Sequence, residues 1–379
     1  MRNPRLLPVG LLALLLTGCP VMHEPVGPTA GLVSDASSGG DAESETQDVS
    51  SGTAPQSIGD LVQVTLDRNL RQRQLSIETH GAWQVLHGIL AYGQAFEVQT
   101  PQGATPALSY LLAGNRCAGF EPTPGDELGQ PPRRGLRMAM QPASKIGQGH
   151  RDQWLAVVSQ CGLPVDTAIQ GPGEAFTLAD WIRQAEYDVP RNLELEFSWT
   201  LIALTAYQPT DHRWIARDGM EYSTEDLLYS ELQQSLESSV CGGTHRLIGI
   251  AMALSKRKQE GKPITGVWAE ADAAIQLALE DAKQNQNADG SYSPAYLHRA
   301  GWTRDLGESL GTTGHVLEFV AFAGSDEMLT QPWVQRSVRR LCDVLEKCQE
   351  VELECGVLYH ALHGLSEYQR RLTQIQASS

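Results

Sequence analysis

The feature that most constrains the fold is a repeated alternation between two kinds of helical segment. From Ile58 onward, apolar residues recur with helical spacing, and strand-like alternation is scarce. Amphipathic segments are followed by segments that are apolar nearly all round; the four pairs are 177–189 with 199–206, 224–239 with 247–254, 267–284 with 316–323, and 333–347 with 356–365. An amphipathic helix keeps one face in solvent, whereas a helix apolar on all sides must be surrounded by protein. The alternation predicts an all-α domain with an outer and an inner layer of helices.

A polar residue marks the start of each predicted inner helix, and these residues are regularly spaced. They are His80, His150, Trp199, His245, His315 and His360, at intervals of 70, 49, 46, 70 and 45 residues. The intervals indicate a period near 46 with two additions of about 24 residues. Repeats of this length with two helices each form stacked or closed helical hairpins. About six pairs are predicted, enough to close a ring.

One turn supports this prediction through a family resemblance. Residues 286–292, QNADGSY, resemble the Q-x3-G-x-W turn of the squalene and terpenoid cyclase–prenyltransferase superfamily, with Tyr292 in the place of the usual Trp. The resemblance implies an α/α toroid, two concentric rings of helical hairpins, over 58–379. The chain has neither the D-x-D-D nor the D-D-x-x-D motif, so the resemblance does not extend to cyclase or prenyltransferase chemistry.

Residues 97–149 interrupt the helical pattern with seven prolines and many glycines. A long irregular segment inside a compact domain usually covers something or lies at its periphery. We therefore expect either a flap over one mouth of the ring or a peripheral insertion.

The N-terminus resembles a bacterial lipoprotein signal. Arg2 and Arg5 precede an apolar run from Leu6 to Leu16, which is too short to span a bilayer and ends in Leu-Thr-Gly-Cys19. The resemblance implies that residues 1–18 are removed and that Cys19 carries the lipid. It places the protein in the bacterial cell envelope, anchored to the membrane and facing the periplasm or the exterior. An ordinary cleaved signal with an accidental Cys is the alternative.

Residues 19–57 have the composition of a disordered acidic tether. They contain six acidic residues, no Lys or Arg and no aromatic residue, and are rich in Pro, Gly and Ser. The formal net charge of −16 argues against a nucleic-acid partner, since nucleic-acid binding requires a basic surface. The expected partners are the membrane, through the lipid, and an envelope protein or glycan.

Histidines concentrate near the predicted starts of the inner helices. If those helices run parallel, their first turns gather at one mouth of the ring, which predicts a shared binding site. Its predicted members are His80, His87, His150, His360, His363 and Asp289. The alternative is that histidine only packs well where an apolar helix reaches the surface.

Metal binding is the more specific hypothesis for the predicted site at this mouth of the ring. Cys241 and His245 stand four residues apart, so they share a face if helical, and His315 starts the next inner helix. Cys and His are ligands that zinc prefers, and three of them leave one position open for chemistry. Prenyltransferase β subunits bind zinc at a toroid mouth through an acid, a Cys and a His. Neither C-x-x-C nor H-E-x-x-H is present.

The thiols have competing interpretations. Six cysteines remain after Cys19, an even number that is compatible with disulfides in an oxidising compartment. Cys348 and Cys355 flank a predicted turn and form the best candidate pair, and simple burial is the alternative.

Two classes of function fit the sequence. The first is a non-catalytic domain that binds an envelope partner or glycan. The second is a hydrolase or lyase acting on polysaccharide, with His245, His315 and Glu308 as catalytic acid–base groups, with or without a metal. The absence of a known catalytic signature favours the first.

Overall fold

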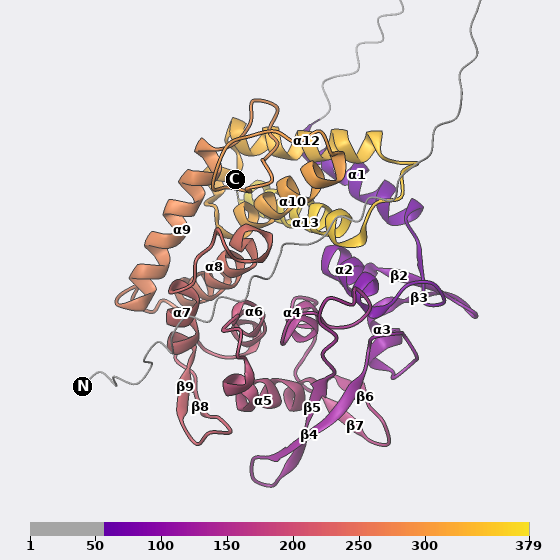
Figure 1. Ribbon diagram of the computed structural model, residues 1–379, viewed down its shortest axis with the longest axis vertical. Coiled ribbons are helices and arrows are strands. Elements are labelled where there is room, and N and C mark those ends of the chain that lie inside the picture. Colours follow the sequence, from indigo (N-terminus) through magenta and orange to yellow (C-terminus); the bar gives the residue numbers. More distant parts are fainter. Residues whose placement is uncertain (1–56, 379) are drawn as a thin grey trace, which may run out of the picture. The chain divides into compact units, whose positions relative to one another are not determined.

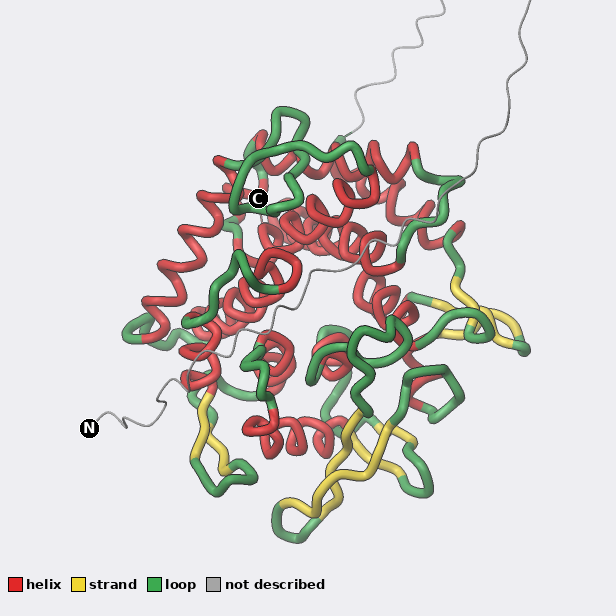
Figure 2. The backbone as a smooth tube through the Cα atoms, viewed as in Figure 1, coloured by secondary structure: helices red, strands yellow, loops and turns green. Residues whose placement is uncertain are grey.

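A computed structural model describes residues 57–378 of the chain (Figure 1). The predicted signal at 1–18, the predicted lipidation site Cys19 and the predicted tether, apart from its last residue, lie outside the described residues. Within 57–378 the chain is mainly helical, with thirteen α-helices and four small sheets (Figure 2). None of these helices combines the length and the apolar character needed to cross a membrane.

Six helices pack against one another in a closed cycle (Figure 1). Each contacts the next along the chain, and the last returns to contact the first. They are α2 (Ala82–Tyr92), α4 (Gln153–Ser159), α6 (Ser198–Tyr207), α8 (Thr244–Gln259), α10 (Leu306–Ala323) and α13 (Cys355–Ser378). Burial on all sides explains their apolar sequences: every residue of α10 from Ser309 to Ala321 is buried.

Six further helices lie against the outside of this cycle. α1 packs on α13, α3 on α2, α5 on α6, α7 on α6 and α8, α9 on α8 and α10, and α12 on α10 and α13. Their bounds are α1 (Ile58–Gln72), α3 (Ala107–Leu112), α5 (Leu178–Asp188), α7 (Thr224–Leu232), α9 (Val267–Gln284) and α12 (Pro332–Lys347), and the short α11 (Asp326–Leu329) contacts α12 and α13. Four of them, α1, α7, α9 and α12, bury one face and expose the other, as the amphipathic segments predict, whereas every residue of α5 is buried or half-buried.

Glycines allow the closest approach within the cycle, between α10 and α13. A Cβ on Gly314 would lie 2.7 Å from the Cα of Ala361, and one on Gly364 would lie 2.9 Å from the backbone nitrogen of Glu318. No side chain fits at either position, so the two helix backbones are in direct contact.

The turn at 286–292 joins three helices. The Gln286 amide donates to the Trp333 carbonyl and the Ser337 hydroxyl of α12, at 2.8 and 2.7 Å. Tyr292 donates its hydroxyl to the Ala282 carbonyl of α9, at 2.8 Å, and its backbone N–H to Thr313 of α10, at 3.1 Å. The amide and the aromatic residue thus connect neighbouring helix ends.

The expectation of a purely α-helical domain is corrected by the strands. The segment 97–149 contains two hairpins, β2 (Glu97–Thr100) with β3 (Gly103–Pro106) and β4 (Pro122–Leu128) with β5 (Arg133–Met138), separated by α3. Two smaller hairpins are β6 (Ala168–Gln170) with β7 (Ala175–Thr177) and β8 (Arg213–Ile215) with β9 (Glu221–Ser223), and β1 (Leu75–Ser76) adds in parallel to β2. Three hairpins lead directly into α3, α5 and α7. Such short strands leave too little alternation for the sequence pattern to reveal.

Part of the 97–149 segment lies over the N-terminal ends of two inner helices. The first N–H groups of α2, on Ala82 and Trp83, donate to the carbonyls of Ala118 and Ile146 at 2.7 and 2.8 Å. Lys145 forms an ion pair with Glu354, one residue before α13, at 3.3 Å. These contacts satisfy helix-terminal donors that would otherwise need water.

The predicted helix starts are accurate where capping side chains mark them. Thr177 and Ser223 each accept from the backbone N–H three residues on and form capping boxes at the starts of α5 and α7. The start of α10 was misplaced: the helix begins at Leu306, capped by Asp305, so His315 lies in its middle and not in its first turn.

Candidate metal centre

Four buried histidines from four inner helices form one cluster. The ring centroids of His315 and His360 are 4.0 Å apart, and His245 lies 5.3 Å from each of them. His87 lies 5.3 Å from His360. They come from α2, α8, α10 and α13, so the cluster depends on the closed cycle.

Three of these imidazoles are held in one tautomer by the protein. The Nδ1 atoms of His87 and His315 bond to the carbonyls of Trp83 and Gly311 one turn earlier, at 2.5 and 2.7 Å. The Nδ1 of His360 bonds to a carboxylate oxygen of Glu318 at 2.8 Å. Carbonyl and carboxylate oxygens can only accept, so each Nδ1 carries a proton, and the neutral rings of His87 and His360 keep a lone pair on Nε2. Metal-binding histidines are commonly oriented in this way.

His245 is buried with neither ring nitrogen hydrogen-bonded. Burial, together with the neighbouring His360 and His315, holds its pKa well below the usual value, so the ring is neutral. Leaving a buried polar group unsatisfied costs about 1–3 kcal/mol. A ligand that accepts the lone pair of His245 would remove part of that cost.

Cys241 reaches the cluster through a left-handed turn. Cys241, Gly242 and Gly243 all have positive φ, at 52°, 62° and 74°, immediately before α8. This conformation is strained for a residue with a Cβ. The turn is held by His298, whose Nε2 bonds to the Gly242 carbonyl at 2.8 Å, and by Tyr296, whose ring leaves no space for a Cβ on Gly242.

The ligand atoms of Cys241, His245 and His315 all lie within 4.8 Å of one another. Burial lowers the pKa of His315 and the adjacent Cys241 sulfur raises it, to about 9 on balance. A cation bound between this sulfur and the imidazole would displace the proton of His315, because metal binding displaces protons from its ligands. One thiolate and two imidazoles suit zinc and leave a fourth coordination position for water or substrate.

Glu318 links His360 to His363 behind the cluster. Its two carboxylate oxygens accept from His360 and His363, at 2.8 and 2.6 Å, and all three side chains are buried. Burial raises the pKa of Glu318, but the two histidines outweigh this and hold it well below the usual value. Burial lowers the pKa of His363 while Glu318 raises it, with a net increase. The carboxylate is therefore ionised and favours the protonated form of His363.

His360 stays neutral in this arrangement. Burial and the charge of the neighbouring His315 lower its pKa to about 3, despite the Glu318 carboxylate. Its Nε2 consequently carries a lone pair at neutral pH, oriented by the hydrogen bond to Glu318. Sequence reasoning missed Glu318; the signal was a single acid in the otherwise apolar segment 316–323.

A cavity of about 450 Å³ reaches the cluster from one side and is lined by both His150 and His245. His150 bonds to Glu196 through Nδ1 at 2.7 Å, and its ring centroid lies 6.4 Å from that of His245. The other lining side chains are mainly polar: Arg151, Asn192, Glu194, Glu196, Gln234, Ser235, Ser238, Ser239 and Arg246, with Met140, Pro142 and Val240 as the apolar members.

Several predicted site residues lie elsewhere. Glu308 is exposed in the first turn of α10, where Thr303 donates to it, about 10 Å along the helix axis from His315. Asp289 accepts from Ser291 and pairs with Arg340 at 3.5 Å. His80 bonds to Ser76 and Thr79 in the turn before α2. These contacts are local, and we assign none of these three residues to the centre.

The cysteines of residues 57–378 are all free, so the candidate disulfide between Cys348 and Cys355 is not formed.

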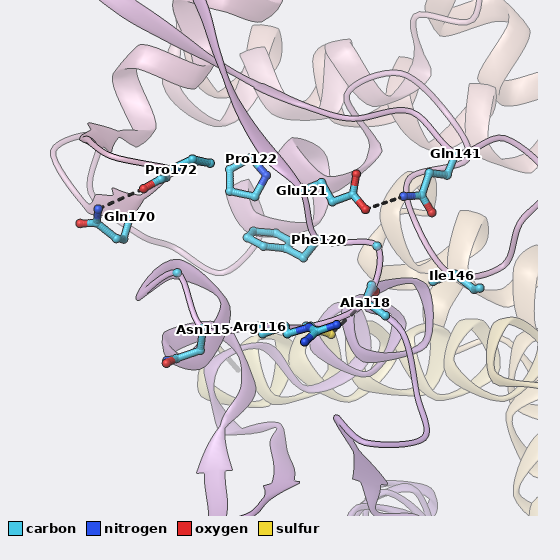
Figure 3. A pocket seen from close by; sticks show the side chains of 14 residues that line it. Asn115, Arg116, Ala118, Phe120, Glu121, Pro122, Gln141, Ile146, Gln170 and Pro172 are labelled. Carbon is cyan, nitrogen blue, oxygen red and sulfur yellow. Dashed lines mark hydrogen bonds between the residues drawn. The ribbon is translucent and has the colours of Figure 1, made fainter.

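A second cavity, of about 610 Å³, lies in the 97–149 segment and the nearby turn of β6 and β7 (Figure 3). Phe120, Glu121 and Arg116 line it, and none of the clustered histidines does. It is separate from the candidate metal centre.

No protein-family model, curated protein or solved structure matches this chain. The function must therefore be argued from the site.

Proposed function

We propose that residues 58–379 form an α/α toroid of six helical pairs whose histidine-rich mouth is a zinc-dependent active site for polysaccharide cleavage, by hydrolysis or elimination. The architecture is supported by the closed cycle of α2, α4, α6, α8, α10 and α13, with outer helices packed against all of them except α4. The observation that carries the function is the convergence of Cys241, His245 and His315.

Each residue of the site has a role in this proposal. Cys241, His245 and His315 hold the ion, which when bound supplies a Lewis acid and lowers the pKa of bound water. His360 accepts the proton from the attacking group, since the hydrogen bond from Nδ1 to Glu318 keeps the ring proton on Nδ1 and leaves the lone pair on Nε2 free. Glu318 and His363 act through His360 and are positioning residues.

The cavity supports a polar substrate. Eleven of the fifteen residues lining it have charged or hydrogen-bonding side chains, and only three are apolar. An isoprenoid would find little apolar surface there, whereas the hydroxyl groups of a glycan would find donors and acceptors. The same polar lining also suits a non-catalytic glycan-binding domain, which is the second candidate function.

We further propose that the protein is anchored in the cell envelope through lipid on Cys19. The short apolar run ending in Leu-Thr-Gly-Cys19 supports this location. Placing the domain at the envelope would bring its cavity to envelope or imported polysaccharides.

Metal analysis combined with turnover tests the proposal. We expect the purified protein to hold one zinc per chain and to cleave a polysaccharide in a panel of envelope and plant glycans. Cys241→Ser and His245→Ala should each lose zinc and activity, and Cys117→Ser, a buried thiol outside the cluster, should lose neither. Zinc and glycan binding without turnover would select the binding domain, and a metal-free active protein would refute the zinc centre.

A further inference from the structure

Arg151 stands out among the residues lining the cavity because, within the described residues, no side chain forms a hydrogen bond or ion pair with it, and the adjacent Asp152 acts on it only through its charge. It follows His150 directly and lies just before α4. Its Nε is buried without a hydrogen-bond partner. Within residues 57–378, no carboxylate or carbonyl forms an ion pair or hydrogen bond with its guanidinium. Arg151 as a whole is half-buried, so its Nε loses hydration without gaining a partner while the rest of the side chain stays within reach of a ligand.

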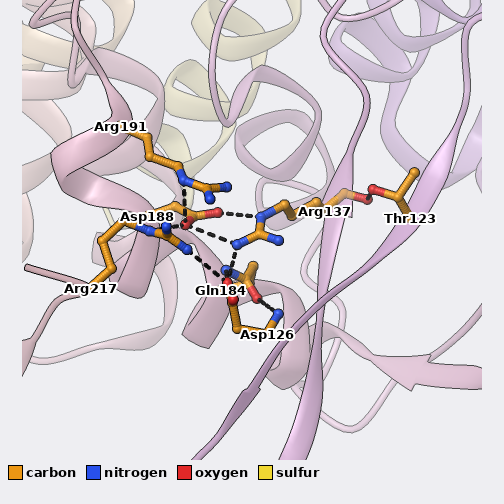
Figure 4. Close-up of polar contacts among 7 residues, drawn as sticks. All are labelled: Thr123, Asp126, Arg137, Gln184, Asp188, Arg191 and Arg217. Carbon is orange, nitrogen blue, oxygen red and sulfur yellow. Dashed lines mark hydrogen bonds and ion pairs between the residues drawn. The ribbon is translucent and has the colours of Figure 1, made fainter.

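The neighbouring arginines, by contrast, are all paired with carboxylates (Figure 4). Asp188 accepts from Arg137 at 2.5 Å and from Arg217 at 3.0 Å, and it pairs with Arg191 at 3.6 Å. Asp126 bonds to both Arg137 and Arg217. Every arginine of this network is matched by a carboxylate.

The carboxylates near Arg151 are already engaged. Asp188 and Asp152 line a separate, small cavity that Arg151 also lines. Asp188 already pairs with the three arginines drawn in Figure 4. Asp152 accepts from the Thr200 hydroxyl at 2.7 Å. Arg246 is the other arginine that lines the cavity of about 450 Å³. Its guanidinium bonds to Glu231 at 2.7 Å and to Ser239 at 2.9 Å.

The acids that line the cavity of about 450 Å³ do not pair with the guanidinium of Arg151 either. Glu196 is held by His150 and by the Asn192 side chain. Glu194 is exposed and forms no ion pair within the described residues. Arg151 is therefore the cation of this cavity that is available to a ligand.

We propose that the cavity takes an acidic polysaccharide and that Arg151 binds the carboxylate of one of its uronate units. The guanidinium presents two parallel N–H groups to a planar carboxylate, a match that a neutral sugar lacks. Hydroxyl groups of the same glycan would meet the serine and amide side chains of the cavity. This inference rests on the proposed function, because it assigns the substrate of that site.

Binding of defined oligosaccharides tests the inference. Calorimetry on the full chain would compare an oligouronate with a neutral oligosaccharide of equal length, at low and moderate salt. We expect the oligouronate to bind at least tenfold more tightly, with the advantage falling as salt rises. Arg151→Gln should remove this difference in affinity by weakening the binding of the oligouronate, while the affinity for the neutral oligosaccharide stays the same. Arg116→Gln, which removes an equal charge from the other cavity, should have no effect.

The outcomes separate this inference from the zinc proposal. Equal affinity for the two oligosaccharides, or undiminished oligouronate binding by Arg151→Gln, would overturn the inference, whatever the zinc content. Arg151-dependent oligouronate binding by a protein without zinc would uphold it and refute the metal centre. If a phosphorylated or sulfated oligosaccharide displaces the oligouronate, the assignment of a carboxylate is overturned.

Discussion

At the scale of single residues, Glu318 has the clearest energetic consequence. It is a buried carboxylate whose charge is balanced by His363 and whose second oxygen is used by His360. Breaking a buried pair leaves an uncompensated charge and typically costs 3–5 kcal/mol. We predict that Glu318→Gln lowers the free energy of unfolding by about 3 kcal/mol, measured by urea denaturation. The matched change Glu308→Gln, on an exposed carboxylate, should stay within about 0.5 kcal/mol. Equal effects of the two changes would show that Glu318 is not an ionised partner of His363.

The buried histidines also predict the dependence of stability on pH. His87, His245 and His360 have lowered pKa values because burial disfavours the imidazolium, so the unfolded chain binds more protons than the folded one below about pH 6.5. Stability should therefore fall with pH below 6.5, by up to about 1.4 kcal/mol per pH unit for each histidine. His315 and His363 have raised pKa values and are protonated in both states there, so they do not oppose the fall.

Urea unfolding at pH 7.5, 6.5 and 5.5 measures this slope. His87→Asn should reduce it by one histidine's share, because the replaced side chain no longer titrates. A free energy of unfolding that is constant from pH 6.5 to 5.5 would contradict the assignment of neutral buried imidazoles.

Sequence reasoning reached part of the centre and missed part, for a physical reason. The helical period predicted that Cys241, His245 and His315 approach one another, and the structure brings them together. Glu318 was hidden inside an apolar segment, because its partners come from α13, 42 and 45 residues away. The unmatched charge of Arg151 depends on which carboxylates fold beside it, and no sequence pattern records that.

At the scale of elements, the contact between α10 and α13 sets the spacing of the centre, since these helices carry His315, Glu318 and His360. Adding a methyl group at Gly364 would bring a Cβ to 2.9 Å from the backbone of α10. We predict that Gly364→Ala lowers the free energy of unfolding by about 1–3 kcal/mol through overpacking. Gly59→Ala, at a helical position of α1 whose Cβ has space, should be neutral or slightly stabilising. Thermal unfolding of the two variants checks this, and an unchanged Gly364→Ala would contradict the close backbone contact.

Helices were predictable where their burial is one-sided, and strands were not. The segment predicted at 267–284 is the helix α9 with the same bounds, because its apolar stripe and the preceding Gly266 are local signals. The hairpins of 97–149 depend on pairing between distant residues, such as Pro122 with Met138. Prolines and glycines correctly indicated a break in helix there, without indicating which structure replaced it.

At the scale of the whole molecule, the proposed anchor has a direct test. If Cys19 is the lipidation site, cells fed an alkynyl palmitate should label the protein, and Cys19→Ser should abolish the label and release the protein from the membrane fraction. Cys161→Ser, a half-buried thiol in the helical domain, serves as the control and should remain labelled. Labelling that persists in Cys19→Ser would contradict the lipoprotein assignment.

The cycle of inner helices and the layer outside it are consistent with the period of about 46 residues and the alternation of helix types. This arrangement places side chains from residues 87, 245, 315 and 360 within one cluster, although they are far apart in sequence. Our central proposal is that this cluster binds zinc through Cys241, His245 and His315.

X-ray absorption at the zinc edge, on the purified full-length protein, tests that claim most directly. The account predicts one zinc per chain whose nearest neighbours are one sulfur at about 2.3 Å and two imidazole nitrogens at about 2.0 Å, completed by a light atom from water. Cys241→Ser should remove the sulfur contribution. A protein without stoichiometric zinc, or a zinc spectrum without sulfur, would contradict the metal centre.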